Sequence, residues 1–275
     1  MPITEFCLVP NVLRTRPRTA FADVFIRRMG GGGQSTLVGT SEGDFYVVKF
    51  ANGPQGPNTI FNEAFGTILA LHLGLPMPDW SPVYLSQSLI RRNAAFSFET
   101  GSGTRAVSPG LHFGSKFVLG SRDDEVYDVV PHTWMERLEN AHFFAGALLL
   151  DLWAENVDLR QVLFLEGSES RTLSAIFIDQ GHMFGGPFGN KRIKVDHSNL
   201  YYQRNIYKRA FDDGYVRNFL FRIEAMNENI LQALLERVPL EWRTATLDQH
   251  AISLLLRNKE GLRTRAEAMA RRFLN

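Results

Sequence analysis

A run of four glycines at residues 30–33 constrains this chain strongly, because it separates two stretches with the pattern of β-strands. Residues 22–26 lie before it and residues 45–50 after it, and Glu42-Gly43 marks the tip of a hairpin between them. A glycine run can turn its backbone N–H groups towards an anion, although it is more often a flexible turn. It matches neither the P-loop nor the Rossmann fingerprint. The beginning of the chain is therefore expected to be rich in strands.

The pattern then changes from strands to helices. An apolar stripe over residues 60–73, followed by Gly74, predicts a helix in the first half. Strands are expected near residues 81–85 and 115–119. In the second half, helices are expected at residues 139–153, 216–238 and 250–274, with short strands at 162–165 and 173–178. This order predicts an α+β protein in two parts, residues 1–120 and residues 121–275.

Composition restricts the classes of function. The 275 residues carry 30 Lys and Arg against 29 Asp and Glu, a net charge of +1, so charge gives nucleic acid no support as a partner. The only cysteine, Cys7, excludes an intramolecular disulfide and suits a reducing compartment. The start of the chain lacks a signal-peptide pattern, and the longest apolar stretch, near residues 145–150, is too short to cross a bilayer. A cytoplasmic protein without a membrane partner is expected.

Lys49 and Glu63 form the first pair of candidate functional residues. Lys49 lies in the predicted strand after the glycine run, and Glu63 lies on the predicted helix that follows. A lysine in a strand usually points to solvent, but a kinase uses one to hold nucleotide phosphates and positions it with a carboxylate on a facing helix. The order of these features favours a nucleotide site. Its candidate residues are Gly31, Gly32, Gly33, Gln34, Ser35, Lys49 and Glu63.

Asp158 lies in a polar stretch between the apolar helix and the first short strand. It could accept a proton from a substrate hydroxyl or position that hydroxyl. Arg160 could neutralise Asp158 or contact phosphate. The alternative is a polar loop capped by Asp and Asn, which fits many proteins.

Asp179 ends the second short strand and precedes a glycine turn. A carboxylate in this position suits magnesium bound to phosphates, although alone it would be an ordinary turn residue. His182 is expected to orient Asp179. Asp158 and Asp179 flank the predicted pair of strands, and phosphoryl transfer needs one carboxylate for the acceptor and one for the metal.

Three segments together resemble the HipA-like kinase family. Residues 31–78, which begin GGGQSTLVGTSEGDFYVVKF, resemble its N-lobe. DLWAENVDLRQVLF and IFIDQGHMFGG resemble its catalytic and metal-binding segments. The resemblance covers about residues 20–190. It implies a bilobal fold related to protein kinases and phosphatidylinositol kinases, with a β-rich N-lobe and a helical C-lobe.

The resemblance also implies ATP and Mg²⁺ as cofactors. It assigns phosphate binding to Lys49, pairing with this lysine to Glu63, catalysis to Asp158, metal binding to Asp179, and the adenine-binding hinge to residues 117–120, which include Phe117 and Val118.

The catalytic segment departs from the family pattern Asn-x-Asp-Arg-His-x-x-Asn, whose last Asn is a metal ligand. This chain reads Asn156-Val-Asp158-Leu-Arg160-Gln161 and has no Asn at the later position. Gln161 is the expected substitute through its side-chain carbonyl, and Asn156 is a further metal candidate.

Three functions follow from these residues. The first is an ATP- and magnesium-dependent phosphotransferase to a Ser or Thr hydroxyl of a protein. The second is a kinase of the same fold that acts on a small molecule or a lipid headgroup. The third is a nucleotide-binding pseudokinase that acts as an interaction protein, which the missing Asn favours and the retained charged residues disfavour. The sequence names neither the acceptor nor an antitoxin-like partner.

Overall fold

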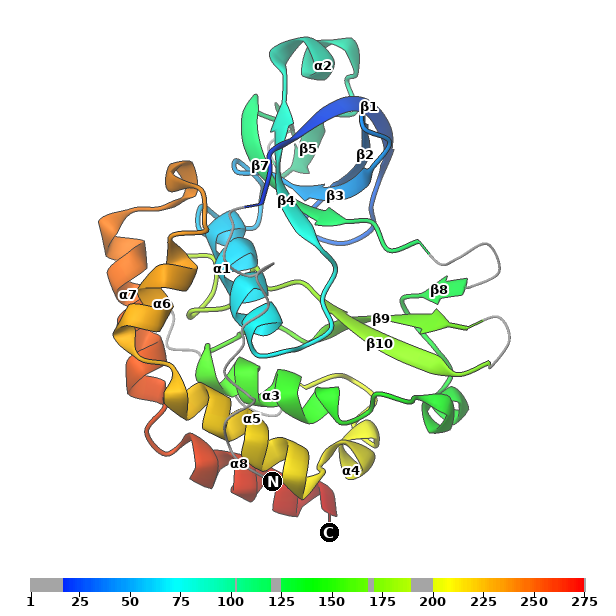
Figure 1. The fold of residues 1–275 in the computed structure, drawn as a ribbon. Coiled ribbons are helices and arrows are strands. Elements are labelled where there is room, and N and C mark those ends of the chain that lie inside the picture. Colours follow the sequence, from blue (N-terminus) through cyan, green and yellow to red (C-terminus); the bar gives the residue numbers. More distant parts are fainter. Residues whose placement is uncertain (1–16, 102, 120–124, 168–170, 189–199, 275) are drawn as a thin grey trace.

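The computed structural model describes residues 17–274, except residues 102, 120–124, 168–170 and 189–199. The first half forms a closed barrel with the strand order β1-β2-β3-β7-β4 (Figure 1). Its strands are β1 (Ala20–Arg28), β2 (Thr36–Thr40), β3 (Phe45–Lys49), β4 (Trp80–Leu85) and β7 (Gly110–Lys116). Neighbouring strands are antiparallel, except that β1 and β4 are parallel.

The glycine run joins β1 to β2, and Glu42-Gly43 joins β2 to β3. The predicted hairpin tip is confirmed, because the Gly43 amide donates a 3.0 Å hydrogen bond to Thr40 O. The strands predicted at 22–26, 45–50 and 81–85 are present. The strand predicted at 115–119 begins earlier and ends at Lys116.

A small hairpin and a short helix cover one end of the barrel (Figure 1). They are α2 (Gln87–Arg92), β5 (Ser97–Thr100) and β6 (Gly103–Ala106). Aromatic rings hold this cover in place, since Phe96 and Phe98 both pack edge-on against Phe50, which follows β3. The barrel thus has an apolar core of its own.

Helix α1 (Thr59–His72) follows the barrel strand that carries Lys49, as predicted. Every residue from Thr59 to Ala70 is buried, which is unusual for a helix with polar residues such as Asn62 and Glu63. Buried polar groups need partners, so this helix is expected to bond to the elements around it.

The second half combines a three-stranded antiparallel sheet with helices. The sheet contains β8 (Glu125–Tyr127), β9 (Gln161–Glu166) and β10 (Leu173–Ile178), so both predicted short strands are confirmed. The helices are α3 (Phe143–Trp153), α4 (Ile206–Ala210), α5 (Asp213–Ala225), α6 (Glu228–Leu235), α7 (Ala245–Asn258) and α8 (Leu262–Leu274). No helix in the described ranges is both long and apolar enough to span a membrane.

Two long helices predicted from periodicity are each divided in the structure. Residues 216–238 form the end of α5 and then α6, because the Asn227 side chain accepts a hydrogen bond from Ile230 N and starts a new helix. Residues 250–274 are interrupted at Gly261, whose φ of +69° does not fit an α-helix. The helix predicted from residue 139 begins at Phe143. The boundary predicted near residue 120 falls outside the described residues.

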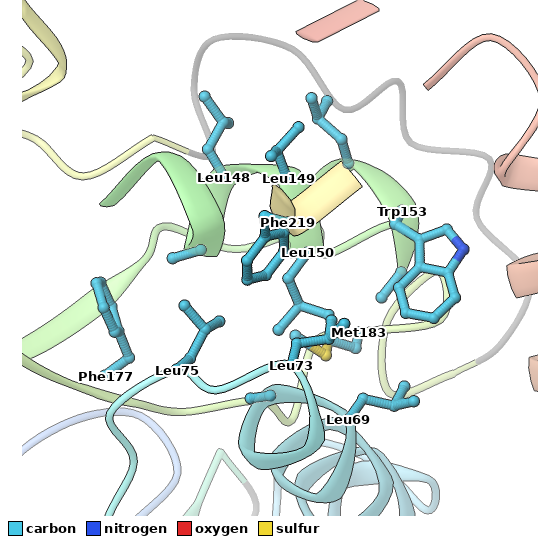
Figure 2. Close-up of a cluster of buried hydrophobic side chains, with 14 of the residues drawn as sticks. Leu69, Leu73, Leu75, Leu148, Leu149, Leu150, Trp153, Phe177, Met183 and Phe219 are labelled. Atoms are coloured by element: carbon cyan, nitrogen blue, oxygen red, sulfur yellow. The ribbon is translucent and has the colours of Figure 1, made fainter. Parts of the chain in front are cut away.

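The largest apolar core joins α1 to the second half of the chain (Figure 2). Side chains from the end of α1 pack against α3, β10 and α5. The buried members labelled there include Leu69, Leu73, Leu75, Leu148, Leu149, Leu150, Phe177, Met183 and Phe219. Glu63 therefore sits on a helix that is anchored to the same core as the segment after β10.

Candidate active site

Lys49, Glu63 and Asp179 meet at one point. Lys49 ends β3, Glu63 lies in α1, and Asp179 follows β10 directly. The Lys49 Nζ atom lies 2.8 Å from Asp179 Oδ1 and donates a hydrogen bond to Glu63 Oε1. One ammonium group therefore links the barrel, α1 and the second sheet.

Burial and charge act against each other in this cluster. The side chains of Lys49 and Asp179 are 16% exposed and that of Glu63 is 2% exposed. Burial alone would lower the pKa of Lys49, but the charges of Asp179 and Glu63 raise it above its usual value. Burial opposes ionisation of Asp179, but Lys49 outweighs it and lowers the pKa of Asp179. Burial raises the pKa of Glu63, although Lys49 opposes this rise. Asp179 is the carboxyl group that the cluster keeps ionised.

Helix α1 also holds the turn after Asp179. Glu63 Oε2 accepts a 3.0 Å hydrogen bond from Gln180 N, and Asn62 Nδ2 donates to Gly181 O at 3.0 Å and Met183 O at 2.8 Å. A Cβ at Gly181 would lie 2.7 Å from Glu63 Oε1, so this close approach requires glycine. Asp179 itself has a φ of +64°, in the left-handed region that is unfavourable for residues other than glycine. Such a conformation persists only where the surrounding structure holds it, and it is common at functional sites. The turn is thus fixed before any ligand arrives.

Asp158 lies beside this cluster on an open loop and is 42% exposed. Its Oδ1 accepts a 2.8 Å hydrogen bond from Leu159 N, while its Oδ2 lies 4.0 Å from His182 Nε2. His182, predicted to orient Asp179, is therefore placed next to Asp158. One oxygen of Asp158 is anchored, and the other faces solvent and the histidine, where it can accept a proton from an entering hydroxyl.

Arg160 and Asn156 bond to a buried residue that the sequence analysis did not single out. Arg160 Nε donates a 3.0 Å hydrogen bond to Asp151 Oδ2, and Arg160 Nη1 donates to Gln180 Oε1 at 2.9 Å. Asn156 Nδ2 donates to Asp151 Oδ1 at 3.0 Å, and Asn156 Oδ1 accepts from Asp158 N at 3.2 Å. Arg160 is 4% exposed and Asn156 is 1% exposed. Both therefore support the loop that carries Asp158.

Gln161 is the first residue of β9 and is exposed. It pairs with Ile178, the last residue of β10, so it lies beside the backbone that leads into Asp179. The described residues contain no group of three or more His, Cys, Asp or Glu that could hold a metal ion. Asp179, with Gln161 beside the strand that leads into it, stays the predicted source of metal ligands.

The glycine-rich loop is tied to neighbouring loops by glutamine side chains. Gln34, at a φ of +48°, donates from Nε2 to Glu99 O and accepts from Glu99 N at Oε1, both at 2.8 Å. Its side chain is therefore occupied by β5. Gly33 lies against the side chain of Gln55, whose Nε2 is 3.4 Å from His182 Nε2. The side chains of Gln55 and His182 thus lie between the glycine-rich loop and Asp158.

The remaining predicted nucleotide residues lie in two places, in or next to the glycine-rich loop and after β7. Ser35 is buried just before β2, whereas Gly31 and Gly32 have open space where a Cβ would be. Phe117 and Val118 are half-buried and follow β7, the strand that pairs with β3 and Lys49. Phe117 N donates a 2.8 Å hydrogen bond to Phe45 O, while Gly120 lies outside the described residues.

The supporting residues Asp151, Asn62 and Gln55 carry no sequence signal of their own. Asp151 lies in an apolar helix, where the sequence suggests only that it is near the helix end. Asn62 is one polar position in an apolar stripe. Asp151 bonds to residues five and nine positions further along the chain, but the partners of Asn62 and Gln55 lie up to 127 residues away. Such contacts are set by the fold and do not follow from local spacing.

Comparisons with known proteins bear on the family and the fold of this chain. A model of the HipA-like kinase family matches residues 23–260. No curated protein matches the chain significantly. The fold is similar to the Helicobacter pylori proinflammatory kinase CtkA, with a TM-score of 0.59 and 13% identity over 92% of this chain and 99% of that one.

Two further solved structures are similar. Hydra Fam20 with sugar has a TM-score of 0.55 and 13% identity over 95% of this chain and 89% of that one. The Golgi casein kinase with Mn and ADP bound has a TM-score of 0.56 and 11% identity over 96% of this chain and 76% of that one. These likenesses confirm the predicted α+β, bilobal, kinase-like fold.

Proposed function

Because this chain belongs to the HipA-like kinase family, we propose that it transfers the γ-phosphate of ATP, with Mg²⁺, to a Ser or Thr hydroxyl of a protein. The single observation that carries the proposal is the contact of Lys49 with both Glu63 and Asp179. A scaffold protein would gain nothing from burying three charged groups together, because their desolvation costs free energy. A kinase needs this lysine in place to hold phosphate oxygens.

The donors around Asp179 fit a hard divalent cation. Its carboxylate is kept ionised by Lys49, and Mg²⁺ prefers such oxygen ligands. Because Mg²⁺ usually takes few protein ligands together with phosphate oxygens and waters, Asp179 and Gln161 are a sufficient protein contribution. When bound, the ion would neutralise phosphate charge during transfer.

Asp158 is suited to receive the proton of the substrate hydroxyl to which the phosphate is transferred. Its free oxygen would accept the hydroxyl proton while that hydroxyl oxygen bonds to the γ-phosphorus and the bond to the β–γ bridging oxygen breaks. ADP and a phosphate ester would be the products. The open surface around Asp158 favours a protein acceptor, since a small-molecule kinase would be expected to enclose the hydroxyl that it modifies. The single Cys7 supports a reducing cytoplasm as the compartment.

A direct test uses labelled ATP, Mg²⁺ and the purified protein. We expect ATP with Mg²⁺ to raise the unfolding temperature and ADP to form, because a ligand of the folded state stabilises it. Asp179→Asn, which keeps size but removes the charge, should lose most of the Mg²⁺ dependence of ATP binding. Failure of the unaltered protein to bind ATP with Mg²⁺ would refute the proposal. Binding without turnover would instead favour the pseudokinase, which the Gln161 replacement makes the second candidate.

A further inference from the structure

Gln180 follows Asp179 in the chain, and it is 0% exposed. Its backbone N–H donates a 3.0 Å hydrogen bond to Glu63 Oε2, so its main chain is bonded to the charged cluster. Its side chain points to a different part of the site, because Gln180 Oε1 accepts a 2.9 Å hydrogen bond from Arg160 Nη1. One residue therefore contacts both the charged cluster and the buried arginine that supports the loop after α3.

Arg160 carries the connection on to Asp158. Its Nε and Nη2 atoms both donate to the carboxylate of Asp151, which also accepts a hydrogen bond from Asn156 Nδ2. Asn156 Oδ1 in turn accepts from Asp158 N. Because Arg160, Asp151 and Asn156 are at most 4% exposed, water does not compete for these bonds. A continuous series of hydrogen bonds thus runs from Gln180 to the main chain of Asp158.

Backbone hydrogen bonds also join these two segments, but further along the chain from Asp179. Val157 N, for example, donates to His182 O at 3.0 Å. Closer to Asp179, the connection is made by Arg160 Nη1. Its 2.9 Å bond to Gln180 Oε1 is shorter than its 3.5 Å contact with Asp179 O. The side chain of Gln180 is therefore the firmer link next to the predicted metal ligand.

An amide suits this position for a physical reason. A guanidinium group only donates hydrogen bonds, so the atom that faces Arg160 Nη1 is the amide oxygen. Asp151 already pairs with the charge of Arg160, and a neutral amide accepts from Nη1 without burying a second anion beside Asp179. The amide nitrogen lies 3.9 Å from Met77 Sδ, which is a weak acceptor. The hydrogen bond to Arg160 is thus the stronger contact of the amide group.

We propose that Gln180 is a positioning residue, which keeps the Asp158 loop at a fixed distance from the charged cluster at Lys49. Because Gln180 is buried, it acts through its neighbours. Phosphoryl transfer requires the proton acceptor and the groups that hold phosphate at a set separation, and a misplacement of about 1 Å can cost about 10²-fold in rate. The inference rests on the proposed function and adds the residue that sets this separation.

Gln180→Met tests this role, because methionine has nearly the same size and lacks the oxygen that accepts from Arg160. The probe is labelled ATP with Mg²⁺ and water as the phosphate acceptor, and the readouts are kcat for ADP formation and the Kd of ATP. We expect kcat to fall about tenfold, while the Kd stays within a factor of about two because the backbone bond to Glu63 is retained.

Met77→Leu is the matched control. It removes the sulfur atom beside the amide nitrogen of Gln180 and leaves the bond between Gln180 and Arg160 in place. Its kcat should therefore stay within a factor of about two of the unaltered protein. A tenfold fall in this control as well would assign the effect to packing around the amide and would overturn the inference.

A double-variant cycle separates positioning from a general loss of structure. If Gln180 acts through Asp158, adding Gln180→Met to Asp158→Asn should lower kcat further by less than about twofold in single-turnover measurements. A tenfold further fall would show that Gln180 does not act through Asp158. If Gln180→Met does not fold, Gln180→Asn takes its place, because it keeps the amide but withdraws it from Arg160 by one methylene group.

The outcomes distinguish this inference from the proposed function. An unchanged kcat in the Gln180 variant, or a loss of ATP affinity as large as the loss of kcat, would overturn the inference and leave the kinase proposal intact. Absence of ADP formation by the unaltered protein would refute the kinase proposal and this inference together.

Discussion

Lys49 Nζ lies 2.8 Å from Asp179 Oδ1, so the last residue of β3 is paired with the residue that follows β10. Glu63 shares the same ammonium group. Lys49 keeps Asp179 ionised, whereas burial raises the pKa of Glu63 to about 7 against the opposing charge of Lys49. The contact therefore assembles the charged cluster on which the proposed nucleotide site rests.

Lys49→Met should remove ATP binding and also destabilise the fold. Without the ammonium group, Glu63 and Asp179 face each other in a buried position, and loss of one partner of a buried pair costs about 3–5 kcal/mol. Urea unfolding measures this loss. The matched control is Lys49→Met with Glu63→Gln, which should recover part of the stability but no activity. Equal stability of the single and double variants would contradict the charge argument.

Asp158→Asn should lower kcat by about 10²–10⁴-fold, the usual contribution of a positioned general base. Because Asp158 contacts neither Lys49 nor Asp179 in the described structure, ATP affinity should stay within a factor of about two. The residue is partly exposed, so unfolding should change by less than about 0.5 kcal/mol. Single-turnover transfer and ATP titration separate these quantities. A parallel fall in ATP affinity would remove Asp158 from the acceptor role.

Arg160→Met should destabilise the protein by about 3–5 kcal/mol, because it leaves Asp151 charged and buried without its partner. The sequence pattern suggests that Arg160 neutralises Asp158 or contacts phosphate in catalysis, whereas its buried contacts predict a supporting role. Arg160→Met combined with Asp151→Leu should restore most of the stability. If the double variant also regains transfer at saturating ATP, Arg160 does not act on the substrate. A stable double variant without any transfer would return Arg160 to a catalytic role.

Stability should fall with acidification because of His112. Its Nδ1 accepts a 3.0 Å hydrogen bond from Ala51 N, and its Nε2 lies 2.9 Å from Ser108 O, so both nitrogens are used by the neutral ring. Burial lowers the pKa of His112 from 6.5 to about 4, against the weaker opposing effect of the Ser108 carbonyl. Between these values only the unfolded chain takes up the proton. The contribution is therefore complete above about pH 6.5 and declines towards pH 4.

The expected loss is on the order of 3 kcal/mol over that range, since one pKa unit corresponds to about 1.4 kcal/mol. Urea unfolding at several pH values measures it. His112→Asn does not titrate there and keeps an acceptor near Ala51, so its stability should depend less on pH. An equally steep dependence in this variant would assign the effect to other groups.

The sequence by itself determined the order of the functional elements. The strand with Lys49, the helix with Glu63 and the strand before Asp179 follow from local periodicity, and all three lie within one or two residues of their predicted limits. Local patterns suffice here, because strand and helix formation depend on neighbours along the chain. The resemblance of the sequence motifs to the HipA-like kinase family then assigned a kinase site to Lys49, Glu63 and Asp179.

Only the tertiary structure decided which charges meet. Lys49 contacts Asp179, Asn62 bonds to Gly181 O, and His182 Nε2 lies 4.0 Å from Asp158 Oδ2. Buried polar groups must find partners wherever the fold brings them, so their pairing depends on packing between distant segments. Chain order specified the elements, and long-range burial specified the site.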